Sequence, residues 1–478
     1  MNDVKIIDAN ILQTFSLPDS GEIDALLKKE LSQLNKKIVV LDDDPTGVQT
    51  VHGIHVYTDW EEETLIKGFE EQNSMFFVLT NSRGFTAAET TKEHIKMAKN
   101  IAAASKATGK DFIVISRSDS TLRGHYPLET QILKREIEQY TDKRYDGEII
   151  FPFFKEGGRF TIDNVHYVKE GGTLVPAGMT EFAKDKTFGY ASSHLGDWCE
   201  EKTKGDYKAD NMVYISLESL RAADYKGIEQ QLVDTKGFNK IIVNAVDYSD
   251  VKTFVVALLR ALNRGKEFMF RSAAAVTKVL GGVSDKPLLE KSELVLKGNS
   301  NGGIILIGSH VNKTTMQLEK LHDCRYPIEF IEFNQHLVLQ DGGLESEVKR
   351  VVAVAESKIK SGVTVAVYTR RDRLDLPDAD KDKQLEVSVK ISNAVTSIIG
   401  RLNTRPNFII AKGGITSSDV GTKALKVKCA LVMGQIRPGI PVWMTGEESK
   451  FPGMPYIIFP GNVGEVTDLC TVVETLME

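Results

Sequence analysis

Residues 38–47 read IVVLDDDPTG, and this short stretch decides the first half of the fold. Its first four residues are apolar and three of them are β-branched, which is typical of a buried strand. Three carboxylates follow at once, and a proline and a glycine end the strand sharply. Adjacent like charges repel one another and lose solvation near an apolar sheet, so a metal, a cation or polar hydroxyl groups must compensate them. The stretch therefore predicts a ligand site at the carboxyl end of a strand, with a solvated acidic turn as the plain alternative.

The composition of the 478-residue chain is that of a soluble globular protein with two to three domains. Its net charge of -6 argues against nucleic acid or an anionic membrane as the main partner. We find no secretory pattern at the N-terminus and no apolar run long enough to span a membrane. The four cysteines are scattered without a C-x-x-C motif, which supports neither a disulfide framework nor a zinc site. We therefore expect a reduced, cytoplasmic protein.

The first half of the chain repeats one order: a buried apolar strand, a polar loop that contains glycine, and then a helix. This order is typical of a largely parallel sheet covered by helices. One helix has a clear start, because Thr86 stands at an N-cap position and Glu89 completes a capping box. Residues 155–210 break the order and are expected to form loops. The predicted strands are 38–41, 54–57, 75–80, 112–115 and 149–152.

The second half repeats the strand and helix order after a polar, glycine-containing stretch. We predict an α/β protein made of two α/β domains with largely parallel sheets. The division is an N-terminal extension at 1–35, a first domain at 36–290, a linker at 291–303 and a second domain at 304–478. The strands expected in the second domain are 304–307, 363–367, 408–411, 429–433, 441–443 and 456–459.

Charged and polar side chains gather after the strands of the first domain. Arginine forks bind a carboxylate group through two hydrogen bonds, and aspartates accept hydrogen bonds from sugar hydroxyl groups. A small polyhydroxy acid needs both kinds of partner, whereas internal salt bridges between loops are the plain alternative. The residues are the carboxylates Asp42, Asp43, Asp44 and Asp119, the guanidinium groups Arg83, Arg117, Arg123 and Arg159, and the imidazoles His125 and His166.

Three loops of the second domain contain glycine and follow predicted strands, at 308–310, 413–418 and 460–464. Glycine lets backbone amide groups approach phosphate oxygens closely, so three such loops in one domain indicate a nucleotide phosphate site. The spacing is not that of a P-loop. No G-x-G-x-x-G motif follows any strand either, so the dinucleotide fingerprint is missing.

The acidic stretch also permits a phosphatase interpretation. Asp42, Asp44 and Thr46 have the Asp-x-Asp-x-Thr spacing that resembles the nucleophile motif of haloacid-dehalogenase-type phosphatases. Such enzymes also need a downstream lysine and a late acidic pair. Asp247 and Asp250 are a loose candidate for the pair, and no suitable lysine precedes them.

Taken together, the motifs resemble those of the four-carbon acid sugar kinase family, which was once a domain family of unknown function. The resemblance covers almost the whole chain except residues 1–35. It implies a sugar-acid-binding domain at 36–290, an ATP-binding domain at 304–478, and phosphorylation of a terminal hydroxyl group of threonate, erythronate or a 3-oxo-tetronate. The motifs that carry it are DDDPTG at 42–47, NSR at 81–83, DSTLRGH at 119–125, GRFT at 158–161, VHYV at 165–168, FGYASS at 188–193, FRSAA at 270–274, GGIT at 413–416 and PGNVG at 460–464.

The resemblance also assigns roles to single residues. Ile415 departs from the family, which often has an acidic residue there, and this leaves the Mg²⁺ ligands open. The sequence does not decide which aspartate accepts the hydroxyl proton. The expected catalytic residues are Asp44, Asp119 and Arg123, the substrate-binding residues Asp42, Asp43, Arg83, Arg159 and His166, and the ATP-binding residues Ser309, Gly413, Gly414, Ile415, Thr416, Gly461, Asn462 and Gly464.

The expected partners are a small sugar acid, ATP and Mg²⁺, with no nucleic acid and no membrane, and a homodimer is compatible with the sequence. A sugar-acid sensor that binds a nucleotide for regulation is the alternative from a different class of protein.

Overall fold

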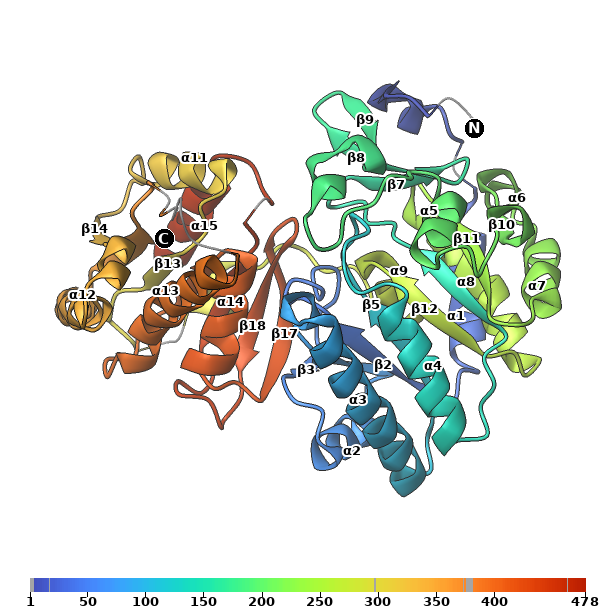
Figure 1. Ribbon diagram of the computed structural model, residues 1–478, viewed down its shortest axis with the longest axis horizontal. Coiled ribbons are helices and arrows are strands. Elements are labelled where there is room, and N and C mark those ends of the chain that lie inside the picture. The colour runs from blue at the N-terminus through green and yellow to red at the C-terminus, as the bar shows by residue number, and fades with distance from the viewer. Residues whose placement is uncertain (1–3, 17, 296–297, 373, 375–380, 462) are drawn as a thin grey trace. The chain divides into compact units, whose positions relative to one another are not determined.

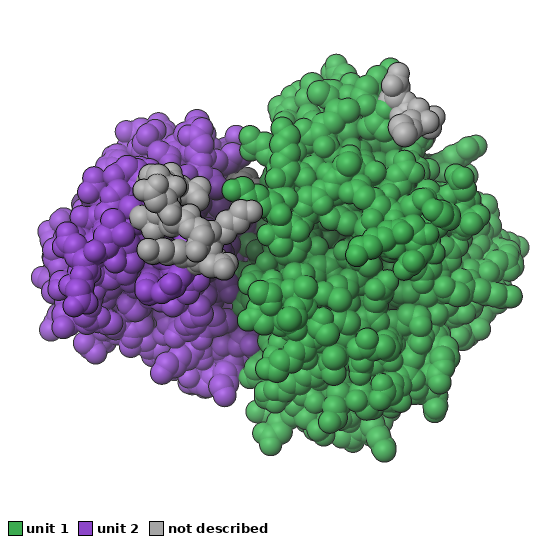
Figure 2. Space-filling model, viewed as in Figure 1, with its two compact units in different colours: residues 1–51, 59–284 green, residues 52–58, 285–478 purple. Residues whose placement is uncertain are grey.

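The computed structural model describes residues 4–16, 18–295, 298–372, 374, 381–461 and 463–478. The chain forms two compact units, which Figure 2 shows in different colours. The first unit contains the residues up to 51 together with 59–284, and the second contains 52–58 together with 285–478. The short segment 52–58 thus belongs to the second unit, whereas the sequence-based division places it in the first.

The first unit is built on a parallel sheet (Figure 1). All of its neighbouring strands run parallel, as the order of strand, loop and helix predicts. Residues 38–41 lie near the middle of this sheet and are buried on both faces, which explains their continuous apolar pattern. In spatial order the strands are β10 (Val213–Ile215), β11 (Asn239–Val243), β6 (Gly147–Phe151), β12 (Phe268–Ser272), β5 (Asp111–Arg117), β2 (Lys36–Asp42) and β4 (Met75–Leu79).

Helices cover this sheet, and their ends follow ordinary capping rules. The side chain of Thr86 accepts a hydrogen bond from the Glu89 amide, and the Glu89 carboxylate accepts one from the Thr86 amide, which confirms the predicted capping box. The helices of this unit are α1 (Ser20–Leu31), α2 (Glu62–Glu70), α3 (Ala87–Thr108), α4 (Leu128–Tyr140), α5 (Leu195–Lys202), α6 (Leu217–Arg221), α7 (Tyr225–Asp234), α8 (Tyr248–Asn263) and α9 (Ala274–Leu280).

The N-terminal extension is part of the first unit. Helix α1 packs on α8, and two ion pairs join them, Asp24 with Lys252 at 2.6 Å and Glu30 with Arg260 at 2.9 Å. Before α1, strand β1 (Ile7–Asp8) pairs with a strand of a second, smaller sheet. The residues before the first predicted strand therefore help to build the unit.

That smaller sheet is antiparallel, and three of its four strands lie within 155–210, where the sequence predicts loops. It consists of β1, β9 (Thr173–Pro176), β8 (Val165–Glu170) and β7 (Arg159–Ile162). The prediction of loops was wrong here because the strands are short and several of their buried side chains are polar. The turn at 163–164 has positive φ angles at both residues, a conformation that asparagine and aspartate tolerate in tight hairpins.

The strands of the second unit are paired in a mixed, parallel and antiparallel arrangement. Strands β14 (Ile328–Phe333), β15 (Thr364–Thr369), β13 (Ile304–Ile307), β16 (Ile409–Lys412) and β19 (Pro455–Phe459) are parallel in this spatial order. Strands β18 (Ile440–Thr445), β17 (Cys429–Arg437) and β3 (His55–Tyr57) continue it in antiparallel order. The helices are α10 (Lys291–Leu294), inside the predicted linker, and α11 (Asn312–Leu321), α12 (Gly343–Lys360), α13 (Lys381–Arg401), α14 (Gly414–Asp419) and α15 (Asp468–Met477).

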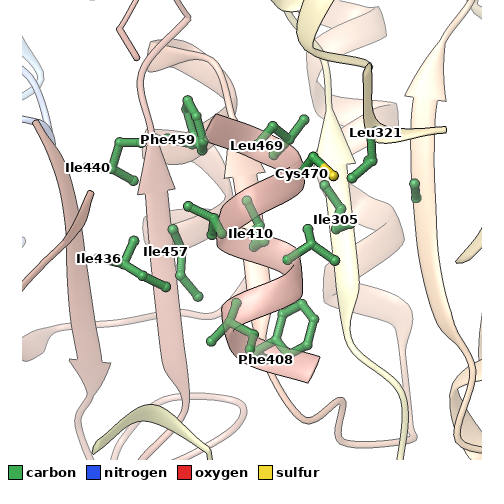
Figure 3. Packing of buried hydrophobic residues seen from close by; sticks show 14 of the residues in the cluster. Ile305, Leu321, Phe408, Ile410, Ile436, Ile440, Ile457, Phe459, Leu469 and Cys470 are labelled. Atoms are coloured by element: carbon green, nitrogen blue, oxygen red, sulfur yellow. The ribbon is translucent and has the colours of Figure 1, made fainter. Parts of the chain in front are cut away.

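The core of the second unit fixes the positions of β13, β16 and β19, whose carboxyl ends carry the predicted glycine loops. Isoleucines of β13, β16 and β19, among them Ile305, Ile410 and Ile457, pack beneath α15 and are completely buried (Figure 3). Each such side chain contributes about 1.5–3 kcal/mol relative to exposure. This packing holds the three strands in register, so their carboxyl ends lie close together. None of the described helices is both long and apolar enough to cross a membrane.

Candidate functional site

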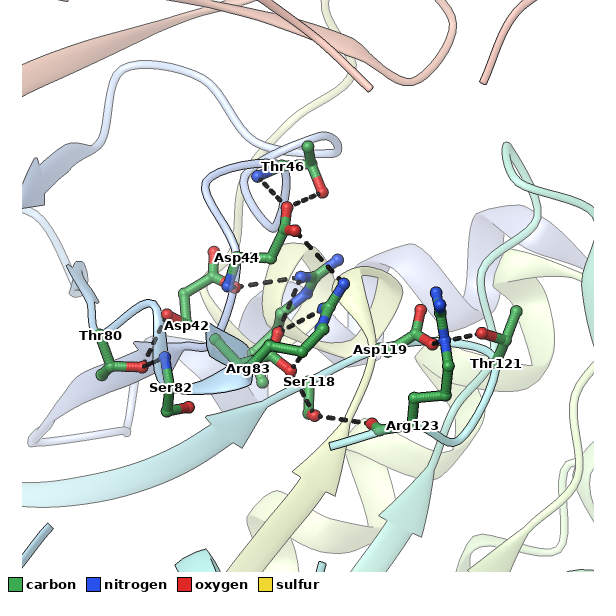
Figure 4. A network of polar contacts seen from close by, with 12 residues as sticks. Asp42, Asp44, Thr46, Thr80, Ser82, Arg83, Ser118, Asp119, Thr121 and Arg123 are labelled. Carbon is green, nitrogen blue, oxygen red and sulfur yellow. Dashed lines mark hydrogen bonds and ion pairs between the residues drawn. The ribbon is translucent and has the colours of Figure 1, made fainter. Parts of the chain in front are cut away.

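Two clusters of the predicted site residues form, one in each unit. The cluster of the first unit, here called the aspartate–arginine cluster, consists of Asp42, Asp43, Asp44, Arg83, Arg117, Asp119 and Arg123. These residues come from the carboxyl ends of β2 and β5 and from the loop after β4, which are neighbours in the parallel sheet. Figure 4 labels Asp42, Asp44, Arg83, Asp119 and Arg123 of this cluster and shows the contacts around them.

Asp42 is the deepest carboxylate of the cluster. Its side chain is 2 % exposed, and the Arg117 Nη1 atom lies 3.0 Å from its Oδ1 atom. Burial raises the pKa of Asp42 to about 7, although Arg117 opposes the rise, and Asp43 and Asp44 add to it by repulsion. Gly47 lies directly against this carboxylate, because a Cβ atom built there would stand 1.8 Å from Asp42 Oδ2.

Arg83 joins the other two aspartates. Its Nη2 and Nε atoms donate to both carboxylate oxygens of Asp43, at 2.6 and 3.1 Å, and its Nη1 atom lies 3.3 Å from an oxygen of Asp44. The short 3₁₀ helix at Ser82–Gly84 brings the guanidinium group to this position. Although burial opposes it, the charges of Asp43 and Asp44 raise the pKa of Arg83 well above its usual value. The bidentate geometry fixes both partners and makes Arg83 a rigid part of the site.

Asp44 is the most accessible of the three adjacent aspartates, with a side chain 15 % exposed. Its Oδ1 atom accepts hydrogen bonds from the amide and the hydroxyl group of Thr46, at 2.9 and 2.5 Å. Burial alone would raise its pKa, but Arg83 and Thr46 outweigh burial and lower it. Asp44 therefore stays ionised, and its side chain is partly exposed.

Asp119 and Arg123 form a second ion pair on the loop after β5. The Arg123 Nε atom lies 2.7 Å from Asp119 Oδ2, and the Thr121 hydroxyl group donates to the same oxygen. Although burial opposes the shift, Arg123 and Arg83 hold the pKa of Asp119 well below its usual range. The guanidinium groups of Arg123 and Arg159 both lie over the ring of Phe182, at 5.0 and 5.8 Å. Arg159 is thereby brought next to the cluster.

His166 lies behind the loop that carries Asp119. Its side chain is 0 % exposed. The Nε2 atom lies 2.8 Å from the Ser120 carbonyl oxygen and therefore donates, so Nδ1 accepts from the Thr161 hydroxyl group at 3.0 Å. Burial lowers the pKa of His166 to about 4, and Arg159 and Arg271 add to the shift. The structure thus places a neutral, fully bonded imidazole beneath the loop.

Arg271 lies in the motif at 270–274, but sequence reasoning assigned it no role in the site. It lies on β12, and its guanidinium group donates to the carbonyl oxygens of Asp119 and Arg123, at 3.3 and 2.9 Å. Its Nε atom is buried without a described hydrogen-bond partner. The signal that could have found it is a lone arginine in an otherwise apolar strand, at the end where its neighbours also end in polar residues.

The second cluster surrounds a cavity of about 370 Å³ in the second unit. Ser309 and residues 413–416 line the cavity, and all of them belong to the predicted nucleotide site. We call Gly308–Ser309, Gly413–Thr416 and Gly461 the glycine cradle. The loops that carry it follow β13, β16 and β19, which are adjacent parallel strands.

The backbones of the cradle approach each other closely. A Cβ atom on Gly308 would lie 2.5 Å from Thr416 Oγ1, one on Gly413 would lie 3.1 Å from Ser309 Cβ, and one on Gly461 would lie 3.3 Å from Ser309 Oγ. Gly413 also has a φ angle of +122°, which side chains disfavour. Gly464 lies against Asp468 instead, and Asn462 lies outside the described residues.

Apart from His310, which lies in the predicted loop 308–310, the rest of the cavity wall was not predicted. It includes hydroxyl-bearing residues of α13 at intervals of four, so they share one face of the helix. This repeat of small polar residues was the signal available in the sequence. The further lining residues are His310, Gln335, Thr369, Leu374, Gln384, Ser388, Ile391, Ser392, Val395 and Thr396.

The acidic pair required by the phosphatase interpretation has other roles. Asp247 and Asp250 form the capping box of α8, and Asp250 also pairs with Arg221 at 3.0 Å. Asp42, the expected nucleophile of such an enzyme, is buried against Gly47 and Arg117. The described geometry therefore gives this alternative no support.

Among the described residues, neither cluster brings together three His, Cys, Asp or Glu donors that could hold a metal ion. Mg²⁺ prefers oxygen ligands. The described lining of the cavity offers the hydroxyl groups of Ser309 and Thr416 but no carboxylate. A separate group, Cys324, Cys470 and Glu474, brings its donor atoms within 4.8 Å of one another, but two of its three donors are sulfur.

Two family models match the chain, one over most of the first unit and one over most of the second. A model of a sugar-binding N-terminal domain matches residues 38–280, and a model of a nucleotide-binding C-terminal domain matches residues 304–469. Among solved structures, a Salmonella typhimurium LT2 protein described as a candidate tRNA synthase is 16% identical, with a TM-score of 0.65 over 92% of this chain and 98% of its own. A Haemophilus influenzae protein described as DUF1537 is 18% identical, with a TM-score of 0.59 over 92% of this chain and 100% of its own. Both show the fold alone, and no curated protein matches the chain.

Proposed function

The chain belongs to the four-carbon acid sugar kinase family, and on this premise we propose that it transfers the terminal phosphate of ATP to a hydroxyl group of a four-carbon sugar acid. Threonate, erythronate and a 3-oxo-tetronate are the candidate acceptors. One observation carries the proposal. The unit that matches the sugar-binding model contains the aspartate–arginine cluster, and the unit that matches the nucleotide-binding model contains the glycine cradle.

The first unit would bind the sugar acid through both positively and negatively charged side chains. Arg123, whose side chain is 23 % exposed, and Arg159 both lie over the ring of Phe182, and two guanidinium groups so placed suit a carboxylate ligand. Asp44 has an accessible, ionised carboxylate that suits a sugar hydroxyl group. Asp43 would act through Arg83, which it holds in a bidentate pair.

The second unit would bind ATP through its backbone. The amide groups of the glycine cradle can approach phosphate oxygens because no Cβ atom stands between the loops. The apolar side chains of Leu374, Ile391 and Val395 line the same cavity and suit the flat face of a base.

Positioning and charge would supply most of the rate enhancement. The transition state of phosphoryl transfer is largely dissociative, so the acceptor oxygen needs alignment more than early removal of its proton. The lowered pKa values of Asp44 and Asp119 fit this, because they make both carboxylates weak bases but good hydrogen-bond acceptors. Mg²⁺ bound to the phosphates would neutralise charge on the transferred group.

The test is ADP formation from ATP and Mg²⁺ across a panel of four-carbon sugar acids, with a three-carbon acid and a no-acid sample as controls. The proposal expects one strong responder and no ADP without acid. ATP binding without consumption across the panel would favour the sensor, and phosphate release from a phosphorylated acid without nucleotide would favour the phosphatase.

A further inference from the structure

Lys412 is a buried cation directly behind the glycine cradle. It is the last residue of β16, its side chain is 0 % exposed, and its Nζ atom lies 4.0 Å from the centre of the Phe459 ring. The Nζ atom donates to the carbonyl oxygens of Pro460 and Gly461, at 2.5 and 3.2 Å. No described carboxylate forms an ion pair with it. An ammonium group in such a place is costly, because burial removes its solvation and no described ion pair replaces it.

The lysine joins two of the three loops of the cradle. It precedes Gly413 in the chain, and its ammonium group holds the loop that contains Gly461. The Gly461 carbonyl oxygen also accepts a hydrogen bond from Thr314 at 3.0 Å, and the Gly413 amide donates to the Phe459 carbonyl oxygen at 2.9 Å. Lys412 therefore fixes the loop positions while its charge stays out of contact with solvent.

We propose that Lys412 is the buried cation of the nucleotide site, which fixes the Gly461 loop against the Gly413 loop and takes up a proton when the phosphate groups of a nucleotide enter the cradle. The inference rests on the proposed function, since it requires that the cradle bind a nucleotide. Phosphate charge next to a buried amine favours the protonated amine, and the protonated amine in turn favours phosphate. Lys412 is thus a positioning residue whose charge depends on the ligand.

The surroundings of Lys412 favour the uncharged amine in the free protein, so that the amine can take up a proton when phosphate binds. Burial and, to a smaller extent, repulsion from Lys313 on α11 lower the pKa of Lys412 to about 7, although Asp468 on α15 opposes the shift. Above neutral pH the amine of the free protein is therefore mostly uncharged. A bound phosphate group raises the pKa again, so binding draws a proton from the solvent, and nucleotide affinity rises as the pH falls from about 9 towards 7.

The experiment is titration calorimetry of the full chain with ADP at about pH 8, in two buffers that differ in ionisation enthalpy, which gives the protons taken up per ADP bound. ADP is fully ionised at this pH and adds little to the count. The wild-type protein is expected to take up most of one proton. Lys412→Met should bind ADP at least about tenfold more weakly and take up none. Lys412→Arg keeps a permanent charge, so it should regain affinity without proton uptake.

Lys423→Met is the matched control, because Lys423 is an exposed lysine of the same unit that pairs with Asp419. It should behave as the wild-type protein does. If Lys412→Met does not fold, proton uptake by the wild-type protein and by Lys412→Arg still tests the inference. ADP binding by the wild-type protein without proton uptake overturns the inference alone, as does undiminished affinity in a folded Lys412→Met protein. Absence of ADP binding by the wild-type protein overturns the proposed function together with the inference.

Discussion

The two sites lie at the same kind of place, the carboxyl ends of parallel strands, but they are built from different material. In the first unit, charged side chains clamp one another, as Arg83 clamps Asp43 and Asp44. In the second unit, glycines and hydroxyl groups make the surface, and Lys412 lies behind it. The first site would recognise its ligand by the placement of charge, and the second by the close approach of its backbone. Removing a charge should therefore damage the first site, and adding a methyl group should damage the second.

The largest effect is expected from Asp44→Asn and Asp119→Asn. Each change keeps the shape of the side chain but removes a carboxylate that Arg83 or Arg123 holds in place. Turnover should fall by at least about a thousandfold, and ATP affinity should stay within about threefold. Steady-state kinetics and ATP titration measure the two quantities. Asp142→Asn, an exposed aspartate of the same unit, is the control. Full activity in both variants would contradict the catalytic assignment.

A methyl group in the glycine cradle should weaken nucleotide binding and leave sugar-acid binding intact. Gly413→Ala puts a side chain at a φ angle of +122° and 3.1 Å from Ser309 Cβ. Nucleotide affinity should fall about a hundredfold, while sugar-acid affinity should stay unchanged. Gly400→Ala in α13 is the control, because its Cβ atom would meet only ordinary contacts. Equal loss of sugar-acid binding would break the division between the two units. Titration of the folded variants with ADP and with the acid distinguishes these results.

The contact between Gly47 and Asp42 is a place in the first site where close packing, and not charge alone, matters. A Cβ atom on Gly47 would collide with the buried carboxylate of Asp42. Gly47→Ala should lower the free energy of unfolding by about 2.5 kcal/mol and weaken sugar-acid binding, while ADP affinity stays the same. Urea unfolding and calorimetry check both parts. A variant as stable as the wild-type protein would show that the carboxylate can move aside.

The smallest expected effect concerns the support beneath the first site. His166 has a folded-state pKa of about 4, below the value of 6.5 in the unfolded chain, so the unfolded chain binds more protons between these values. Its contribution to stability is present above about pH 6.5 and is lost as the pH falls towards 4. Between pH 7.5 and 5 the wild-type protein should lose about 2 kcal/mol more unfolding free energy than His166→Gln. Urea unfolding of both proteins at both pH values measures this loss. An equal loss of unfolding free energy in the two proteins would contradict the prediction.

The sequence revealed the strands and the residues at their ends better than it revealed long-range pairing. The strand at 38–41 and the capping box at Thr86 depend on local patterns, and both were predicted correctly. The antiparallel sheet that contains His166 depends on tight turns and on pairing with β1, which no local pattern indicates. The placement of 52–58 in the second unit is likewise a matter of pairing, since β3 joins β17 far along the chain.

The same reasoning explains what could be foreseen of the two sites. Asp42 and Arg83 were candidates because charged residues after apolar strands are conspicuous. The depth of each aspartate, and hence the difference in pKa between Asp42 and Asp44, requires the neighbouring side chains in three dimensions. Lys412 directly precedes Gly413 in the sequence, but its burial behind the cradle could not be seen without β19 beside it.

The most direct test of the whole account is the stoichiometry of the reaction. ATP, Mg²⁺ and the responding four-carbon acid are incubated with the protein, and ADP and the phosphorylated acid are measured in the same samples. The account predicts that the two products appear in equal amounts and that neither appears with Asp44→Asn. ADP that forms at the same rate without the acid, or that forms without a phosphorylated acid, would contradict the claim that this chain is a sugar-acid kinase.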